Sequence, residues 1–442
     1  MKSRVVKLLL FFLLGMNCPG AFATEIPASP IPTPEQIIAT PDYSDTLFGD
    51  WGGKRGAISA QGYDWEIVYK LDLLSKVSAP DCSGTTTSPC NVIYGLDNLD
   101  IKLSLDGEKL FGKKGSSGML YILSNRGSKP ASASDRLPHG LDNIETPYNG
   151  NTTKLYQAWI QQTFLDEKLS VRVGLYDLNS EFYATESSGI FIHPTFGIGA
   201  ELASTSLNGP SIFPNTSMAV RVKAELAPGY FVQAAILDGV SGDPNNPHGT
   251  HVQFNRGDGT LNILEGIISP VGAEDAHDNK LSLGVWQYTA RFDDWVEKDI
   301  NGDPVKSRSY GYYVLLDKVL LYKAGSNEES INGFVRIGKT NADASPSQFD
   351  MAFSAGLVFS GLLAGRDQDK FGLAFAQERN GAKYLVASGS TVPNEKSFEL
   401  TYRYQVVPGL VLQPEVQYLL NHGSDPAQNK SWWLGTRFEV SF

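Results

Sequence analysis

Residues 430–442 read KSWWLGTRFEVSF. From Trp432 onward, apolar and aromatic side chains alternate with a second row that includes Arg437 and Glu439. A period of two residues is typical of a β-strand with one apolar face and one polar face. Such a strand suits a soluble sheet. It also suits a transmembrane β-barrel, whose outer face meets lipid and whose inner face meets water. The remainder of the chain has to distinguish these two folds.

The composition favours the barrel. Charged residues make up 19% of the 442 residues and aromatic residues 11%, whereas an average soluble protein is roughly 25% charged. The mean hydropathy of −0.19 excludes a bundle of transmembrane helices, but it fits strands that are apolar on one face only. The net charge of −11 argues against nucleic acid and against an anionic membrane surface as partners.

The N-terminus predicts a secretory signal peptide, residues 1–23. Basic residues precede a short apolar run at 8–14, and the sequence AFA at 21–23 is a small-x-small cleavage site. The apolar run is too short to span a bilayer, so a membrane anchor is disfavoured. We therefore expect cleavage after Ala23 and export from the cytoplasm.

Residues 24–46 are rich in proline and predict an extended linker that leads into a barrel domain at 47–442. Cys82 and Cys90 flank a loop of small polar residues. Because export places them in an oxidising compartment, a local disulfide between them is the favoured interpretation. Two lone thiols are a poor metal site, and we expect neither a metal nor a cofactor.

The two-residue alternation recurs along the chain and predicts an all-β fold, a transmembrane antiparallel β-barrel of about 16 strands. The predicted strands are 63–73, 98–105, 119–125, 154–164, 169–177, 217–226, 230–237, 260–268, 280–290, 310–321, 332–339, 351–360, 370–377, 397–406, 410–420 and a closing strand that begins at 432.

Short turns alternate with long polar loops, as in outer-membrane barrels with short periplasmic turns and long extracellular loops. The tight turns are 165–168, 227–229 and 407–409. The long stretches are 127–153, 179–215, 238–258, 291–309, 379–396 and 421–430. The pattern of strand 260–268 is weak, but without it the tight turns would fall on opposite sides of the membrane. We therefore include it, which also makes the strand number even, as these barrels require.

Several stretches resemble the OprB family of carbohydrate-selective porins. Residues 47–55, LFGDWGGKR, resemble the family's L-x-GDWGG-x-R motif, and residues 408–418, PGLVLQPEVQY, match its penultimate strand. Segments 173–177 and 208–214 resemble the two ends of its long third loop. Within that loop, residues 191–197 carry a histidine where the family pattern has asparagine. The resemblance spans about residue 45 to the end.

This resemblance implies a diffusion channel of the bacterial outer membrane that favours sugars and is not an enzyme. The expected partners are carbohydrate substrates, outer-membrane lipid and lipopolysaccharide, and the barrel-assembly machinery, which is expected to recognise a C-terminal Phe442. No nucleic acid is expected. Whether the protein is a monomer or a homo-oligomer stays open.

A sugar carries hydroxyl groups and apolar ring faces, so a selective pore needs charged and amide groups together with aromatic faces. The alternation directs such groups into the lumen. The expected pore-lining residues on strands are Asp64, Glu66, Asp100, Trp159, Arg172, Arg221, Lys223, Glu399, Arg403, Glu415, Trp433, Arg437 and Glu439. Each charge could instead be paired with a strand neighbour and only tune the field.

We expect the long loop 179–215 to enter the lumen and narrow it to the width of a sugar. Glu181 and Glu186 of this loop are expected to line the pore, and Phe191, His193 and Phe196 are expected to form the constriction. Mixed charge signs predict a polar pore without a strong preference for cations or anions.

Two other functions have to be weighed, an outer-membrane barrel enzyme and a soluble secreted glycan-binding β-protein. Paired histidines at 248 and 251 lie in a loop without a helix to fix their geometry, and segment 299–303 lacks the bidentate glutamate of a calcium loop. No nucleophile elbow, phosphate loop or nucleotide fingerprint is present in the sequence. The sequence therefore favours the channel.

Overall fold

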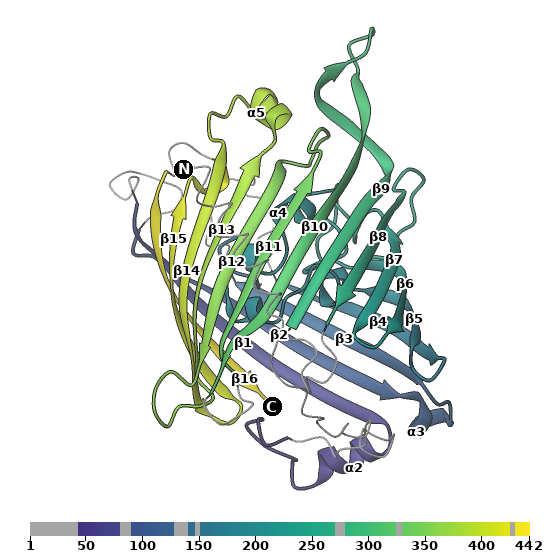
Figure 1. Ribbon diagram of the computed structural model, residues 1–442, viewed down its shortest axis with the longest axis vertical. Coiled ribbons are helices and arrows are strands. Elements are labelled where there is room, and N and C mark those ends of the chain that lie inside the picture. Colours follow the sequence, from purple (N-terminus) through teal and green to yellow (C-terminus); the bar gives the residue numbers. More distant parts are fainter. Residues whose placement is uncertain are drawn as a thin grey trace, which may run out of the picture. The chain divides into compact units, whose positions relative to one another are not determined.

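The computed structural model describes residues 43–79, 90–127, 140–145, 151–269, 279–323, 329–424 and 429–442. Residues 43–442 form one compact unit, and its 16 strands make a closed barrel (Figure 1). Each strand pairs antiparallel with the strands before and after it, and β1 pairs with β16 to close the ring. The predicted fold class and strand number are therefore confirmed.

The strands are β1 Tyr63–Ser78, β2 Ile93–Asp106, β3 Ser116–Gly127, β4 Thr152–Phe164, β5 Leu169–Tyr176, β6 Ser217–Ala227, β7 Tyr230–Asp238, β8 Thr260–Ile268, β9 Asn279–Lys298, β10 Pro304–Tyr322, β11 Glu329–Thr340, β12 Phe349–Ser360, β13 Lys370–Asn380, β14 Asn394–Val407, β15 Leu410–Leu420 and β16 Ser431–Ser441. The helices are α2 Lys54–Ala60, α3 Gly107–Phe111, α4 Ala200–Ala203 and α5 Ala382–Ser388, with 3-10 turns η2 Leu178–Ser180, η3 Ser187–Ile190, η4 Pro194–Phe196 and η5 His422–Ser424. Among the described residues, none of the helices is long and apolar enough to cross a membrane.

Some sequence predictions lie outside the described residues. They are the signal peptide 1–23, residues 24–42 of the linker, and Cys82. Cys90 is disulfide-bonded, and its pairing with Cys82 stays a prediction. Residues 43–46, which the sequence predicts to be part of the linker, belong to the barrel unit. The reason is that the Tyr43 hydroxyl donates a hydrogen bond to the Asp64 carboxylate, 3.0 Å away.

The weak strand 260–268 is present as β8 with the predicted bounds. The predicted loop 291–309 is wrong, because β9 and β10 continue through it and leave only 299–303 between them. This hairpin rises above its neighbours in Figure 1. The extended part of the hairpin is held by α5, which lies in the predicted loop 379–396. Lys383 Nζ of this helix lies 2.7 Å from a carboxylate oxygen of Asp294 and 2.7 Å from a carboxylate oxygen of Glu297.

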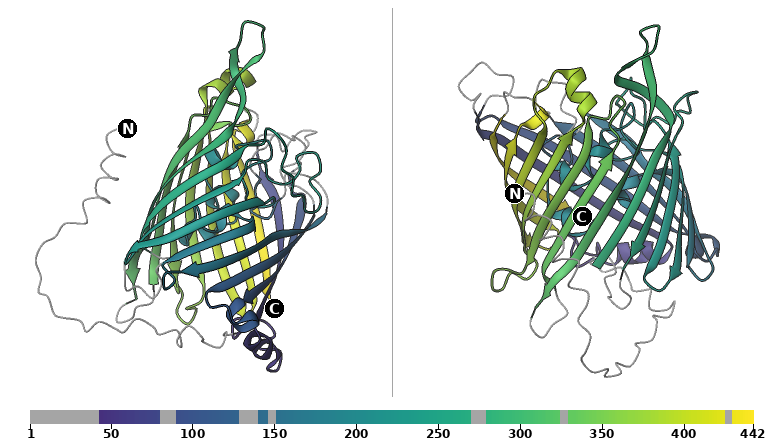
Figure 2. Two further views of the ribbon diagram at one scale, coloured as in Figure 1. Left: turned by 90° about the vertical axis from the view of Figure 1, so that its right-hand side faces the viewer. Right: turned by 45° about the horizontal axis from the view of Figure 1, so that its top comes forward.

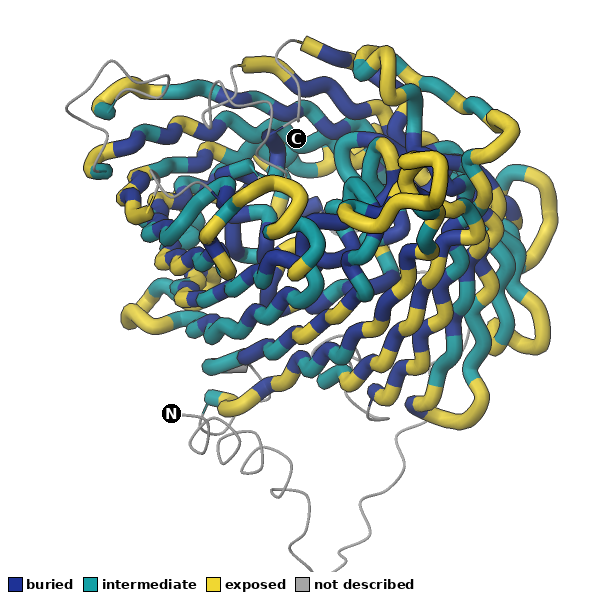
Figure 3. The backbone as a smooth tube through the Cα atoms, turned by 90° about the horizontal axis from the view of Figure 1, so that it is seen from above, coloured by how far each residue is buried: buried dark blue, intermediate teal, exposed yellow. Residues whose placement is uncertain are grey.

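Inward and outward side chains alternate as the sequence predicts. In β16, Trp433 and Arg437 point inward and are buried, whereas Trp432, Leu434 and Phe438 are exposed on the outer face. Figure 3 shows the same alternation of buried and exposed residues along neighbouring strands. Because the outer row is apolar on nearly every strand, the barrel presents a hydrophobic band to its surroundings, as a membrane-spanning barrel requires.

The seam between the first and last strands is covered by the N-terminal motif. The Phe442 amide donates to the Ile67 carbonyl oxygen, 2.9 Å away, and extends the β1–β16 pairing. Arg55 Nη1 donates to the Phe442 carbonyl oxygen at 2.8 Å, and the Phe48 and Phe442 rings lie 5.8 Å apart. Figure 2 shows α2 and the C-terminus at the same end of the barrel. The Asp50 carboxylate fixes this segment by accepting from the Gly56 amide at 2.6 Å.

Deletion of Phe442 should reduce the amount of folded barrel in the membrane. It removes the backbone bond to Ile67, the Arg55 bond and the ring contact with Phe48 together. The measurement is heat-modifiable migration of extracted membranes, with Phe442→Ala as a comparison that keeps the backbone bonds and should be impaired less. Normal levels of the folded deletion variant would contradict a role of this residue in closure.

Candidate functional site

The segment 177–216, which joins β5 to β6, folds into the barrel. Its apolar side chains Phe182, Ile198 and Leu202 are buried in one cluster with Trp286 of β9 and Tyr313 of β10. Further along, Phe191 and Phe196 pack with Phe334 of β11 and with small residues of β13. Figure 3 shows chain segments inside the ring of strands. The inserted loop therefore covers much of the inner wall from β7 to β13.

Charged side chains of the wall hold this loop by its backbone. The Glu399 carboxylate accepts hydrogen bonds from the amides of Ile192 and His193, both at 2.8 Å. Arg336 donates through Nη2 to the Thr195 carbonyl oxygen at 2.8 Å. Backbone groups buried without partners would cost free energy, so these strand side chains stabilise the irregular loop inside the barrel.

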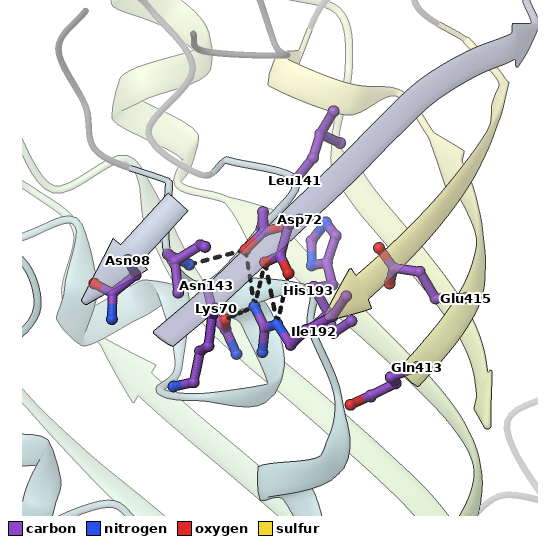
Figure 4. A network of polar contacts seen from close by, with 12 residues as sticks. Lys70, Asp72, Asn98, Leu141, Asn143, Ile192, His193, Gln413 and Glu415 are labelled. Atoms are coloured by element: carbon purple, nitrogen blue, oxygen red, sulfur yellow. Dashed lines mark hydrogen bonds and ion pairs between the residues drawn. The ribbon is translucent and has the colours of Figure 1, made fainter. Parts of the chain in front are cut away.

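A second segment, 140–145, enters from the connection between β3 and β4 (Figure 4). Arg437 of β16 pairs with Asp72 of β1 at 2.6 Å and donates to the Asn143 Oδ1 atom at 2.7 Å. The Asn143 amide donates to the Ile192 carbonyl oxygen at 2.8 Å. The two inserted segments therefore contact each other, and segment 140–145 is fixed to the seam of the barrel.

This arrangement corrects part of the predicted pore lining. Phe191, His193 and Phe196 lie in the inserted loop as expected, but their side chains are buried in its packing and do not face an opening. Several inward residues are likewise covered, because they anchor the inserted segments or lie beneath other side chains. They are Asp100, Arg221, Glu399, Glu415, Trp433 and Arg437.

A network of one carboxylate and two guanidinium groups lies where the loop leaves β5. Arg221 binds Glu181 in bidentate geometry, with Nε 2.8 Å from Oε2 and Nη2 2.9 Å from Oε1. Arg172 Nη1 lies 3.4 Å from the same carboxylate, and its Nε donates to Gln161 Oε1 at 3.1 Å. The Arg172 guanidinium also stacks on the Trp159 ring, 3.8 Å from its centroid.

The local sequence explains this geometry. Arg172 and Arg221 are direct cross-strand partners, an unfavourable pairing of like charges that Glu181 from the loop compensates. Gly174 is the partner of Trp159 and has a φ of +146°. A Cβ at this glycine would lie 2.2 Å from the Ala158 carbonyl oxygen. Glycine is therefore needed here for β5 to approach the strand that carries Trp159.

The charge state of Glu181 follows from two opposing causes. Burial alone would raise the pKa of this carboxyl, but the nearby Arg172 and Arg221 outweigh burial and hold the pKa below its ordinary value. The ion pair therefore contributes stability above the ordinary glutamate pKa and loses it as the pH falls through the lowered pKa. At neutral pH the cluster is one anion between two cations.

Part of this network stays accessible. The side chains of Arg172 and Glu181 are 14% and 19% exposed, whereas Arg221 is 2% exposed and serves as their support. Trp159, Gln161 and Lys223 are partly exposed on the same wall. An amide, a cation, a carboxylate and an aromatic face are thus presented together to the lumen. Gln161 was not among the pore-lining residues expected above, although its position on the inward row of Trp159 is a sufficient signal in the sequence.

Several other predicted lumen residues are paired with their neighbours on the wall. The ion pairs are Lys102–Glu66 at 2.6 Å, Lys70–Asp100 at 3.7 Å and Arg403–Glu439 at 2.7 Å, and Asp64 accepts a hydrogen bond from Tyr43. Glu186 is exposed on the inserted loop. These contacts agree with the alternative interpretation, in which each charge is paired with a neighbour on the wall and only adjusts the electrostatic field of the pore. Within the described ranges, no group of three or more metal-ligating side chains occurs.

Comparison with known proteins identifies the family. The model of the carbohydrate-selective porin, OprB family, matches residues 94–442. The chain belongs to this family. Porin B of Pseudomonas aeruginosa PAO1 is 23% identical over 432 residues, which cover 90% of this porin and 92% of the relative. A putative porin, QuiX, of Acinetobacter baylyi is 21% identical over 428 residues, which cover 90% and 93%.

Solved structures share the fold of this porin. The high-pH structure of Pseudomonas putida OprB superimposes with a TM-score of 0.77 at 20% identity, over 91% of this chain and all of that one. The low-pH structure of the same protein gives a TM-score of 0.57 at 18% identity. The family and the barrel fold together indicate a channel of the outer membrane and not an enzyme.

Glu181→Gln should shift the ion selectivity of this porin toward anions, because it removes the carboxylate that neutralises Arg172 and Arg221. The loss of the charge-assisted bonds should also lower the free energy of unfolding by about 2 kcal/mol. The measurements are the reversal potential in planar bilayers under a salt gradient and the denaturant midpoint. Glu186→Gln, an exposed position of the same loop, is the matched control. An equal shift in both variants would contradict the special role of Glu181.

Proposed function

We propose that this porin is a passive channel through which small neutral sugars, monosaccharides and short oligosaccharides, cross the outer membrane into the periplasm. The observation that supports this most directly is the stacking of the Arg172 guanidinium on Trp159, beside the Gln161 amide, on the accessible part of the lumen wall. These are the groups that bind hydroxyls and the apolar face of a sugar ring.

The route follows from which inner surface stays open. Much of the wall from β7 to β13 is covered by the inserted loop, and inward side chains such as Glu265, Asp317 and Glu399 are buried, although Arg403 of β14 stays 30% exposed. The wall from β1 to β6 keeps accessible polar groups, of which Glu66 is 58% and Lys102 28% exposed. A solute therefore passes along the β1–β6 side and meets Arg172 beside the inserted loop.

The charge pattern of this route favours neutral solutes that can form hydrogen bonds. Lys102 lies beside Glu66, and Glu181 partly neutralises both Arg172 and Arg221, so opposite charges lie close together and their fields partly cancel. A neutral sugar can exchange hydrogen bonds with both members of a pair, whereas a simple ion is attracted by one member and repelled by the other.

The orientation of the barrel in the membrane follows from the lengths of its connections. The long connections face outward, and the end with the short turns and the C-terminus faces the periplasm.

Trp159→Ala and Arg172→Gln should each weaken sugar binding but keep ion conduction. Loss of one stacking face or one charged donor costs about 1 kcal/mol, which corresponds to about fivefold weaker binding. The measurements are sugar-induced block of single-channel current and liposome swelling with monosaccharides and disaccharides. Trp432→Ala, which removes an outward-facing tryptophan next in sequence to the inward Trp433, is the control and should change neither.

Two outcomes would count against this function at different levels. If the purified wild-type protein gave no single-channel steps, the channel itself would be disproved. If the channel conducted ions but sugar block were unchanged in both Trp159→Ala and Arg172→Gln, the assignment of the site would be wrong while the channel would remain.

A further inference from the structure

The outer face of the barrel carries a row of basic side chains at the end opposite the C-terminus. Arg291 of β9 and Arg308 of β10 are direct register partners, and both are exposed. Like charges placed opposite each other on one face of a sheet are destabilising unless an anion compensates them. The pair therefore marks a place where the fold tolerates concentrated positive charge.

The basic row continues across the next strands. Lys339 of β11 is the register partner of Tyr312 of β10 and is exposed. Arg379 of β13 and Lys396 of β14 occupy outward positions near the same ends of their strands. We call Arg291, Arg308, Lys339, Arg379 and Lys396 the basic rim.

Most of the basic rim has no internal counter-charge. Asp350 pairs with Arg379 at 2.7 Å, and the neighbouring Asp293 pairs with Lys306 at 2.6 Å. Within the part of the chain that the structure describes, Arg291, Arg308, Lys339 and Lys396 form no ion pair. Among the side-chain hydrogen bonds of the described residues, these four take part in one, in which Arg291 Nη1 donates to the Lys306 carbonyl oxygen at 3.3 Å.

The basic residues are concentrated on one side of the barrel. At the corresponding ends of β1 to β8, the outward charges within the described ranges are one cation, Arg126 of β3, with its register partner Asp97 of β2, and Asp238 of β7. The asymmetry is thus local, and it opposes the overall net charge of −11. A uniform surface charge for solubility would not produce such a distribution.

The basic rim lies at a boundary between apolar and polar surface. On β10, Tyr310 and Tyr312 are each 54% exposed directly below Arg308. The outward positions that follow toward the periplasm are Val314 and Leu316, and Ile337 follows Lys339 on β11. Tyrosines between an apolar band and basic residues are typical of the membrane–water interface. At this end, the extracellular one, the interface is the outer leaflet.

We propose that the basic rim of β9–β14 binds the phosphate groups of lipopolysaccharide in the outer leaflet. The ligand is a phosphorylated glycolipid whose acyl chains lie along the apolar strands below the rim, while its phosphates meet the guanidinium and ammonium groups. Guanidinium groups suit this role because their fixed donors match phosphate oxygens in pairs. The site is distinct from the lumen and does not depend on which solute passes through it.

A second copy of this chain fits the rim less well. Its own outward surface would have to supply a complementary acidic patch, but Asp97 is already opposite Arg126, and Asp238 is a single carboxylate. Lipopolysaccharide supplies several phosphates next to acyl chains, so it matches both the charge and the adjacent apolar surface.

The test compares lipopolysaccharide retained by wild type and by the triple variant Arg291→Gln, Arg308→Gln and Lys339→Gln. Both proteins are extracted in mild detergent and examined by native mass spectrometry. Because each basic residue near an anionic surface strengthens the binding of that surface, retention should fall at least about tenfold in the triple variant. The matched control is Lys318→Gln, an outward lysine at the opposite end of β10, which should retain wild-type levels.

A rebinding arm identifies the chemical group. Delipidated wild-type protein is titrated with purified lipopolysaccharide and with the same material after chemical removal of its phosphates, and the proposal requires binding of the first to be at least about tenfold tighter. Equal binding of the two would overturn it. Equal retention by wild type and a folded triple variant would also overturn it. Folding is checked by heat-modifiable migration and single-channel conductance. If the triple variant does not fold, the single variants Arg308→Gln and Lys339→Gln are used in its place. The lipopolysaccharide that each retains is then compared with the amount retained by wild type.

Oligomeric state is measured on the same samples. If the triple substitution dissociated an oligomer of this porin without changing the retained lipopolysaccharide, the rim would be an interface between copies and the proposal would be wrong.

Discussion

The structure depends on closure of the hydrogen-bond ring between β1 and β16. A strand edge left open in lipid would expose unpaired backbone groups, each at a cost of several kcal/mol, so the first and last strands must meet. Arg437 and Asp72 face each other across this seam inside the barrel, and Arg55 covers its end. The residues that resemble the family motif at 47–55 thus belong to the closure and lie at the end of the barrel, away from the lumen site.

Closure creates an interior that is far wider than one row of side chains, and this chain fills much of it with its own segments. The loop 177–216 contributes aromatic residues that pack against β9 to β13, while Glu399 and Arg336 satisfy its backbone. The same seam residue, Arg437, reaches the segment 140–145. Closure and narrowing are therefore coupled, because the group that pairs across the seam also anchors part of the insertion.

The predictable part of the fold rested on a short-range rule. The period of two identified every strand and, with the parity of the turns, the weak strand β8. The two-residue period failed to predict strands at 291–309, because charged residues interrupt the alternation there. In the structure, this part of β9 and β10 is supported by Lys383 of α5. That support comes from a segment about 90 residues away, about which the local pattern holds no information.

By itself, the sequence determined which side chains point into the barrel, because pleating alternates faces from one residue to the next whatever lies nearby. Only the tertiary structure decided which of them stay accessible. Glu399 and Arg172 occupy equivalent inward positions, yet Glu399 is buried beneath the loop and Arg172 remains open beside Trp159. Accessibility depends on where two distant segments fold, and that is set by packing and hydrogen bonds between residues far apart in the chain.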